Sequence, residues 1–118
     1  MNGNERNDFA LIMMSTILRT MRNKGNEYSV DGDVNGNFKR VAADTDDTVL
    51  RVWNSYFSKH LDSLRNYVKD PTKPVTEDIR GRIGDMIAYL IILGSLQEEG
   101  VVPVPPLIDQ GPYPREGE

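Results

Sequence analysis

The segment Thr76–Glu99 constrains the fold of this chain more than any other stretch. Its apolar residues recur with the 3.6-residue period of an α-helix. They occupy most sides of that helix, as is typical of a helix buried in a protein core. Thr76 is a residue type that caps helix N-termini, and Gly100 is the residue type most often found just past a helix C-terminus. The pattern therefore predicts one long, largely buried helix from Thr76 to Glu99.

A line of polar residues interrupts this predicted helix. Successive spacings of four, three and four place four side chains on one face: Asp78, Arg82, Asp85 and Tyr89. Gly81 and Gly84 lie beside this line, and a glycine inside a helix costs about 1 kcal/mol relative to alanine. We therefore expect a close neighbour at this face, either another helix or a ligand. If the protein has a functional site, this face is where we expect it.

Two further long helices are predicted upstream. The segment from about Asn7 to Asn23 carries apolar residues on two sides, and such a helix is usually buried on two sides. In so short a chain this favours a subunit interface, and hence a homo-oligomer, over a single broad core face. The segment Thr45–Lys69 is amphipathic and stops before Pro71 and Pro74. The short linker makes it the antiparallel neighbour of Thr76–Glu99.

The remaining segments complete the expected fold. Glycine, asparagine and aspartate dominate Gly25–Asn37 and predict a loop, after which a short helix begins near Asn37. Residues 101–118 hold five of the seven prolines and predict an extended tail. The fold class is therefore all-α: residues 1–100 form an antiparallel bundle of three to four helices, and residues 101–118 form a Pro-rich extended C-terminal tail.

Composition narrows the function classes. A net charge of -4 argues against nucleic acid as the partner, because phosphate backbones are bound by basic faces. The absence of cysteine excludes disulfides and thiolate metal sites. The first residues match neither a signal peptide nor a membrane span, so we expect a cytoplasmic protein with no membrane partner.

The polar residues suggest one kind of chemistry. His60 is the only histidine, and on an apolar stripe it is either a satisfied core residue or a ligand contact. Mg²⁺ typically takes one or two carboxylates together with substrate phosphates, and cationic side chains bind phosphate directly. The alternative is that Asp78, Arg82 and Asp85 form structural salt bridges.

Four short motifs carry a resemblance. They are Lys24-Gly-Asn-Glu27-Tyr28, Asn37-Phe38-Lys39-Arg40, Lys59-His60-Leu61-Asp62, and the run from Arg82 through Asp85 to Tyr89. Between Lys24 and Leu96 the chain resembles small phage-encoded helical proteins related to the MazG-like, all-α nucleotide pyrophosphohydrolases, especially the nucleotide modification associated domain. The resemblance implies a dimeric or higher helical bundle, a nucleotide ligand, and magnesium held by Glu-x-x-Glu and Glu-x-x-Asp pairs on two helices.

Carried onto this chain, the resemblance gives an incomplete metal set. Asp85 takes the aspartate place and is the catalytic candidate, but Arg82 stands at the glutamate place and Lys59 stands three residues before Asp62. The candidate metal ligands are Asp85, Asp62, Asp78 and Glu27. The candidate nucleotide-binding residues are Lys24, Tyr28, Lys59, His60, Arg82 and Tyr89.

Three functions follow from these observations. The first is magnesium-dependent hydrolysis of a nucleoside triphosphate or related nucleotide. The second is nucleotide binding or sequestration without turnover, as a phage protein. The third is a structural or interaction protein with no small ligand.

Overall fold

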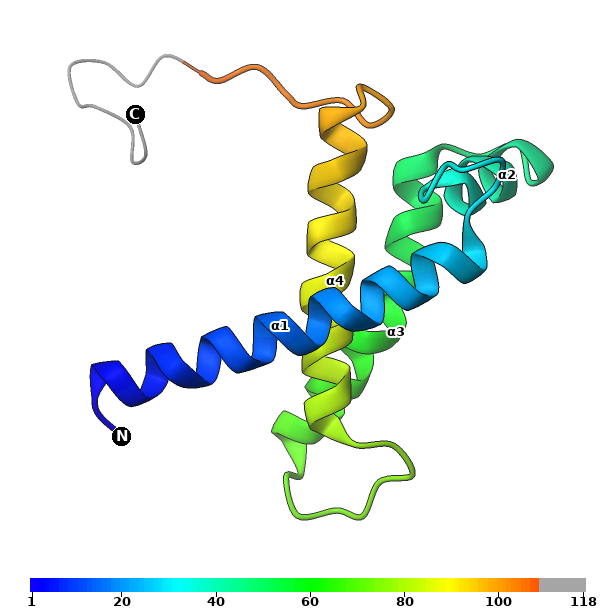
Figure 1. Ribbon diagram of the computed structural model, residues 1–118. Coiled ribbons are helices and arrows are strands. Elements are labelled where there is room, and N and C mark those ends of the chain that lie inside the picture. Colours follow the sequence, from blue (N-terminus) through cyan, green and yellow to red (C-terminus); the bar gives the residue numbers. More distant parts are fainter. Residues whose placement is uncertain (109–118) are drawn as a thin grey trace.

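The structure is a computed structural model, and it describes residues 1–108 apart from the side chain of Tyr28. Four α-helices account for most of this range: α1 (Gly3–Tyr28), α2 (Gly36–Asp44), α3 (Val49–Lys69) and α4 (Ile79–Glu98), as Figure 1 shows. Within these residues, the β structure consists of an isolated antiparallel bridge between Val30 and Asp33. The predicted all-α class is confirmed. No described helix combines the length and apolar character needed to cross a membrane.

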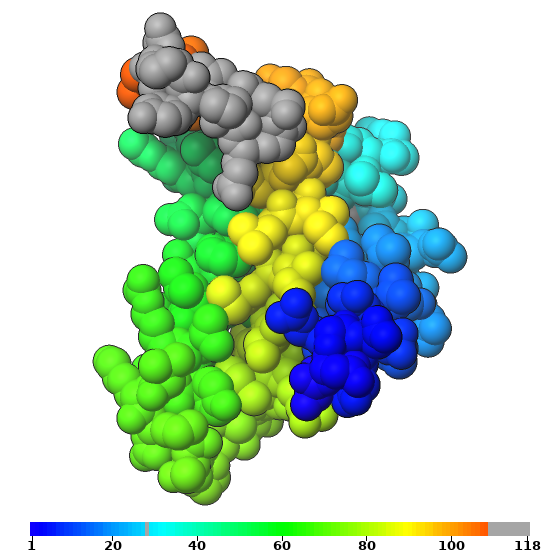
Figure 2. Space-filling model, turned by 90° about the vertical axis from the view of Figure 1, so that its left-hand side faces the viewer, coloured from blue at the N-terminus to red at the C-terminus, as the bar shows by residue number. Residues whose placement is uncertain are grey.

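The helices are arranged around α4. α3 and α4 run antiparallel side by side, α2 packs on the first half of α3, and α1 crosses α4 (Figure 1). Figure 2 looks along α1 from its N-terminal end and shows α4 lying between α1 and α3. The N-terminal half of α1 extends past α4 and away from the α3–α4 pair. The last predicted tail residues, 109–118, lie outside the described range.

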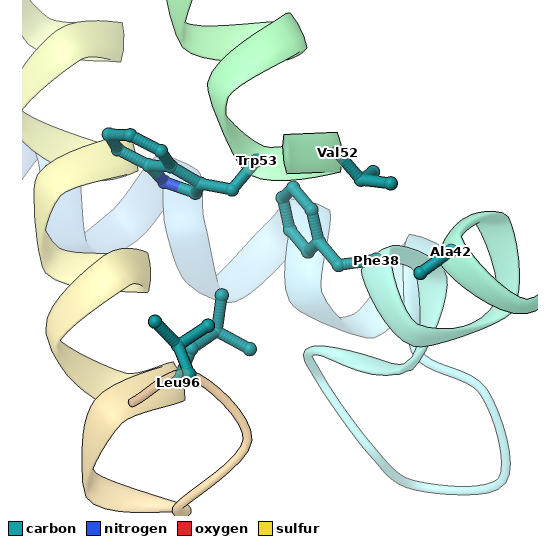
Figure 3. Packing of buried hydrophobic residues seen from close by; sticks show 6 residues of the cluster. Phe38, Ala42, Val52, Trp53 and Leu96 are labelled. Atoms are coloured by element: carbon teal, nitrogen blue, oxygen red, sulfur yellow. The ribbon is translucent and has the colours of Figure 1, made fainter. Parts of the chain in front are cut away.

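The core is small and lies between α2, α3 and the C-terminal half of α4. Figure 3 shows the side chains that fill it, and the buried cluster comprises Phe38, Ala42, Val52, Trp53, Leu96 and Val102. The Trp53 indole N–H donates a hydrogen bond of 2.7 Å to the Tyr89 carbonyl, which satisfies the indole's polar atom inside the core. This bond also ties α3 to the middle of α4.

α1 is longer at both ends than the sequence predicted. It begins at Gly3 because the Asn2 side chain accepts the Glu5 backbone N–H at 2.9 Å and caps the helix. It continues to Tyr28, so the predicted loop start at Gly25 was wrong. A Cβ on Gly25 would lie 3.6 Å from Val34, which shows that the following loop packs on this last turn. That contact offsets the low helix propensity of glycine.

The starts of α3 and α4 also differ from the prediction. Asp46 has a φ of +54°, so the helical conformation does not continue from α2 into α3. Thr48 caps α3 by accepting the Arg51 N–H at 3.2 Å. α4 is capped by Asp78, whose carboxylate accepts the Arg80 N–H at 3.0 Å, and not by Thr76. Asp78 therefore lies at the N-cap, directly before the helix, and the predicted helix start at Thr76 was wrong.

The C-terminal end of α4 follows the prediction and adds to the core. Gly100 has a φ of +75°, a left-handed conformation that glycine adopts without strain. The N–H groups of Val101 and Val102 then donate to the Leu96 carbonyl at 3.0 and 3.2 Å. This turn places Val102 in the core with 2% of its surface exposed.

Candidate functional site

A groove of about 810 Å³ opens between the C-terminal part of α1, the start of α2 and one side of α4. Three aromatic rings form its wall. The rings of Tyr56 and Tyr89 are nearly parallel, with centroids 6.5 Å apart. Phe38 stands edge-on to both of them, at 5.7 Å from Tyr56 and 6.4 Å from Tyr89. This packing holds the wall rigid, because each ring is fixed by two others.

Polar side chains from four segments surround the aromatic wall. α1 contributes Arg22 and Lys24, the loop and the start of α2 contribute Asn35 and Asn37, and α4 contributes Asp85 and Ser95. Cationic groups therefore lie at the α1 side of the groove, where the Asn26 amide also lies, and two further amides lie at the α2 side. Asp85 is the carboxylate among the described lining residues.

A buried amide fixes the loop that forms one edge of the groove. Asn35 is 3% exposed, and its side-chain nitrogen donates to the Ser95 hydroxyl at 3.0 Å and to the Glu99 carboxylate. Lys39 joins the same network by pairing with Asp33 and Glu99. These hydrogen bonds to Lys39 hold the pKa values of both carboxyls below their usual range and raise the pKa of Lys39. The network locks residues 33–39 onto the end of α4.

A second cluster lies beside Tyr89, where α3 meets α4. Arg82 places one guanidinium nitrogen 3.1 Å from His60 Nδ1, and its other terminal nitrogen pairs with Glu77. A guanidinium can only donate, so His60 Nδ1 accepts and the ring proton sits on Nε2. Asp85 approaches the same Nδ1 only to 3.9 Å, beyond hydrogen-bond distance. The His60 ring centroid lies 5.1 Å from that of Tyr89.

The environment of His60 favours its neutral form. Burial is the main cause that lowers the pKa of His60, and the nearby Arg82 and Lys24 charges lower it further. The Asp85 carboxylate opposes this shift, but does not outweigh it. At neutral pH the imidazole is therefore uncharged and presents an Nε2–H donor.

The structure brings together several of the residues predicted from sequence. Lys24, Asp85 and Tyr89 line the groove, His60 packs against Tyr89, and Arg82 holds His60. The ammonium of a further predicted residue, Lys59, lies 5.9 Å from the centre of the Tyr56 ring, outside the groove lining. Nothing can be placed for Tyr28, whose side chain lies outside the described atoms.

The four predicted metal ligands do not gather. Asp62 is exposed on α3, Glu27 is exposed in the last turn of α1, and Asp78 caps α4. Among residues 1–108, no three histidine or carboxylate side chains lie close enough to share a metal ion. The four-carboxylate cage implied by the resemblance is therefore not formed by these residues, and only Asp85 of the four faces the groove.

Sequence reasoning assigned no role to several groove residues. Asn37 and Phe38 line the groove and belong to one of the motifs of the resemblance. That motif is the sequence signal that could have identified them. Tyr56 sits on the apolar stripe of its helix, so periodicity alone predicts only core packing. Asn35 and Ser95 meet across sixty positions of sequence, and neither lies in a local pattern that predicts this contact.

The close neighbour expected beside the glycines of α4 is partly identified. A Cβ on Gly84 would lie 3.8 Å from Ile17 of α1, so a helix approaches there. A Cβ on Gly81 would meet nothing within 4 Å among the described contacts. The helix crossing therefore accounts for Gly84 and leaves Gly81 facing open space.

Comparison with known proteins gave no relative: no protein-family model, no curated protein and no solved structure matches this chain.

Proposed function

We propose that this protein binds a nucleotide in the groove between α1, α2 and α4. The observation that carries the proposal is the pairing of a rigid aromatic wall with cationic side chains at one side. A nucleobase stacks on aromatic rings, and each such stack is worth about 1–3 kcal/mol. Phosphate oxygens pair with charged donors such as Lys24. The groove offers both kinds of contact in one place.

The state of His60 favours binding over catalysis. A general base needs a free lone pair, but Arg82 occupies the Nδ1 lone pair and Nε2 carries the proton. His60 thus serves as a hydrogen-bond donor beside Tyr89. Arg82 acts through His60 in this proposal, as a positioning residue, and does not itself contact phosphate.

Hydrolysis of a nucleoside triphosphate with magnesium, as in MazG-like enzymes, is the second candidate. It is favoured by one observation, the position of Asp85 in the groove. A magnesium ion held by Asp85 and by nucleotide phosphates would supply Lewis-acid stabilisation of phosphoryl charge. The chain's own contribution would be to orient the nucleotide between Tyr89 and Lys24. The MazG-like resemblance also implies a homo-oligomer and a phage origin, and we include both in this second proposal.

Calorimetric titration with a panel of ribo- and deoxyribonucleotides, in the presence of a chelator, tests the binding proposal. We expect saturable binding of at least one nucleotide. Lys24→Ala should raise its Kd about tenfold, because a charge-assisted hydrogen bond is worth about 1.5–3 kcal/mol. Lys69→Ala, at the far end of α3, is the matched control and should leave the Kd unchanged. Equal Kd values in both variants would refute the proposed phosphate position.

The same panel with magnesium separates the remaining functions. Release of pyrophosphate or phosphate that disappears in Asp85→Asn would establish hydrolysis. Binding without release would leave the protein a nucleotide binder or sequestering protein. A ligand present at a concentration of 100 times its Kd stabilises the folded protein by about 2.7 kcal/mol, so a nucleotide that binds must raise the melting temperature. If none does so, an interaction protein without a small ligand is the better interpretation.

A further inference from the structure

One face of α1 is not covered by any other described part of the chain, and its residues follow a regular pattern. It points away from α4, because Ile17 on the opposite side is the residue that α4 buries. Figure 1 shows α1 lying in front of α4 with nothing in front of α1. We call this surface the outer face of α1. It is formed by residues spaced alternately by three and four positions, all of them exposed: Glu5, Asp8, Ile12, Ser15, Arg19 and Arg22.

The outer face has a fixed order of charge along the helix. Its first two residues are acidic, its middle is apolar or small, and its last two residues are basic. Two large apolar side chains flank it, Leu11 and Leu18, which are 70% and 52% exposed. Spacings of three and four are those of a seam between two packed helices. This face has an uncharged centre and ends of opposite charge, so it is complementary to a second copy of itself that runs in the opposite direction.

We infer that α1 pairs antiparallel with α1 of a second copy of this chain, through the outer face. In this register, residues whose numbers sum to 27 face each other. Glu5 faces the partner's Arg22, Asp8 faces the partner's Arg19, and Ile12 faces the partner's Ser15. A parallel pairing would instead set acidic against acidic and basic against basic residues. Like charges facing each other disfavour a pairing, so the charge order selects the antiparallel arrangement.

The flanking residues fit the same arrangement. On one side of an antiparallel seam, Leu11 of each chain lies next to the partner's Leu18, so both exposed leucines leave water.

The pairing would also complete the groove. Leu18 and Arg22 belong both to this surface and to the groove lining. The partner's Leu11 and the partner's Glu5 would therefore stand at the mouth of each groove. The site then becomes a composite of two chains, with one copy of the groove on each side of the two-fold axis.

Light scattering coupled to size-exclusion chromatography over a range of concentrations tests the inference on the full chain. We expect the wild type to have the mass of two chains. Asp8→Arg and Arg19→Asp should each raise the dimer Kd by about tenfold or more, because each creates a like-charge contact at two places in the dimer. The double variant carrying both reversals restores opposite charges and should regain the wild-type Kd. Asp62→Arg, a charge reversal on α3, is the matched control.

Circular dichroism would show whether a single variant loses helix content. Even in that case the double variant tests the inference, because it restores the opposite charges across the interface. A wild type that stays monomeric throughout would overturn the inference, and so would an oligomer whose Kd is unchanged by Asp8→Arg. A double variant no better than the single ones would refute the antiparallel register. Because no nucleotide is present, the outcome is independent of the proposed ligand.

Discussion

Arg82 decides where the proton of His60 lies. Because the guanidinium donates to Nδ1, the neutral ring must carry its proton on Nε2, and the 3.9 Å approach of Asp85 adds charge but no hydrogen bond. Arg82 therefore sets the tautomer of a neighbouring histidine. The salt bridge of Arg82 goes to Glu77, and not to Asp78 or Asp85 as the helical spacing suggested.

His60 should make stability depend on pH below its ordinary pKa of 6.5. Its pKa in the folded protein lies below its ordinary value of 6.5, mainly because of burial. The unfolded chain therefore takes up the proton first as the pH falls. The stabilisation from a neutral His60 is present above pH 6.5 and is lost as the pH falls through the folded-state pKa.

Urea unfolding at several pH values checks this expectation. The wild type should lose stability from pH 7 to pH 5 more steeply than His60→Gln, which cannot titrate. Asp33 and Glu99, whose folded pKa values are lowered from 3.8 and 4.5, are present in both proteins, so their titration contributes equally to the two stability curves. Parallel stability curves for the two proteins would contradict the assignment of a depressed pKa to His60.

At the scale of elements, periodicity predicted which helices exist, and tertiary contacts decided where they begin. Thr76 and Asp78 are both good capping residues, and in the structure it is Asp78 that caps α4. Gly25 reads as a loop residue in sequence, yet packing against Val34 keeps it helical. Asp85 and Tyr89 were predictable for the groove because they share one helix face. Asn35 was not, since its partners Ser95 and Glu99 lie about sixty positions away.

The glycines of the helices should respond differently to alanine. Gly81 and Gly94 face open space within helix α4, so alanine should raise the free energy of unfolding by about 0.5–1 kcal/mol at each. Gly36 begins α2, and a Cβ there would lie 2.6 Å from the Cβ of Val30. Gly36→Ala should therefore lower the free energy of unfolding, by about 1–3 kcal/mol. Urea denaturation of the three variants measures these changes, and a destabilising Gly81→Ala would mean that another molecule or segment contacts this glycine.

At the scale of the whole molecule, one copy leaves much of its apolar surface in water. The buried cluster holds six residues from α2, α3, α4 and the following turn, and among the described side chains of α1 only Ile17 is buried. Apolar side chains of the N-terminal half of α1 stay exposed, among them Phe9, Leu11 and Ile12. A 26-residue helix held at one crossing depends on further contacts for its order, because isolated helices are only marginally stable in water. An antiparallel partner helix would supply those contacts along its length.

The melting temperature should therefore depend on protein concentration. If two chains unfold together, a tenfold increase in concentration stabilises the dimer by about 1.4 kcal/mol. With an unfolding entropy of about 2.1 cal/mol/K per residue, two chains of 118 residues should melt about 3 °C higher. Differential scanning calorimetry at three concentrations, each tenfold apart, measures this shift. Asp8→Arg should flatten the dependence and the double variant with Arg19→Asp should restore it, whereas a wild-type melting temperature that is constant over this range would show that α1 is stable without a second copy.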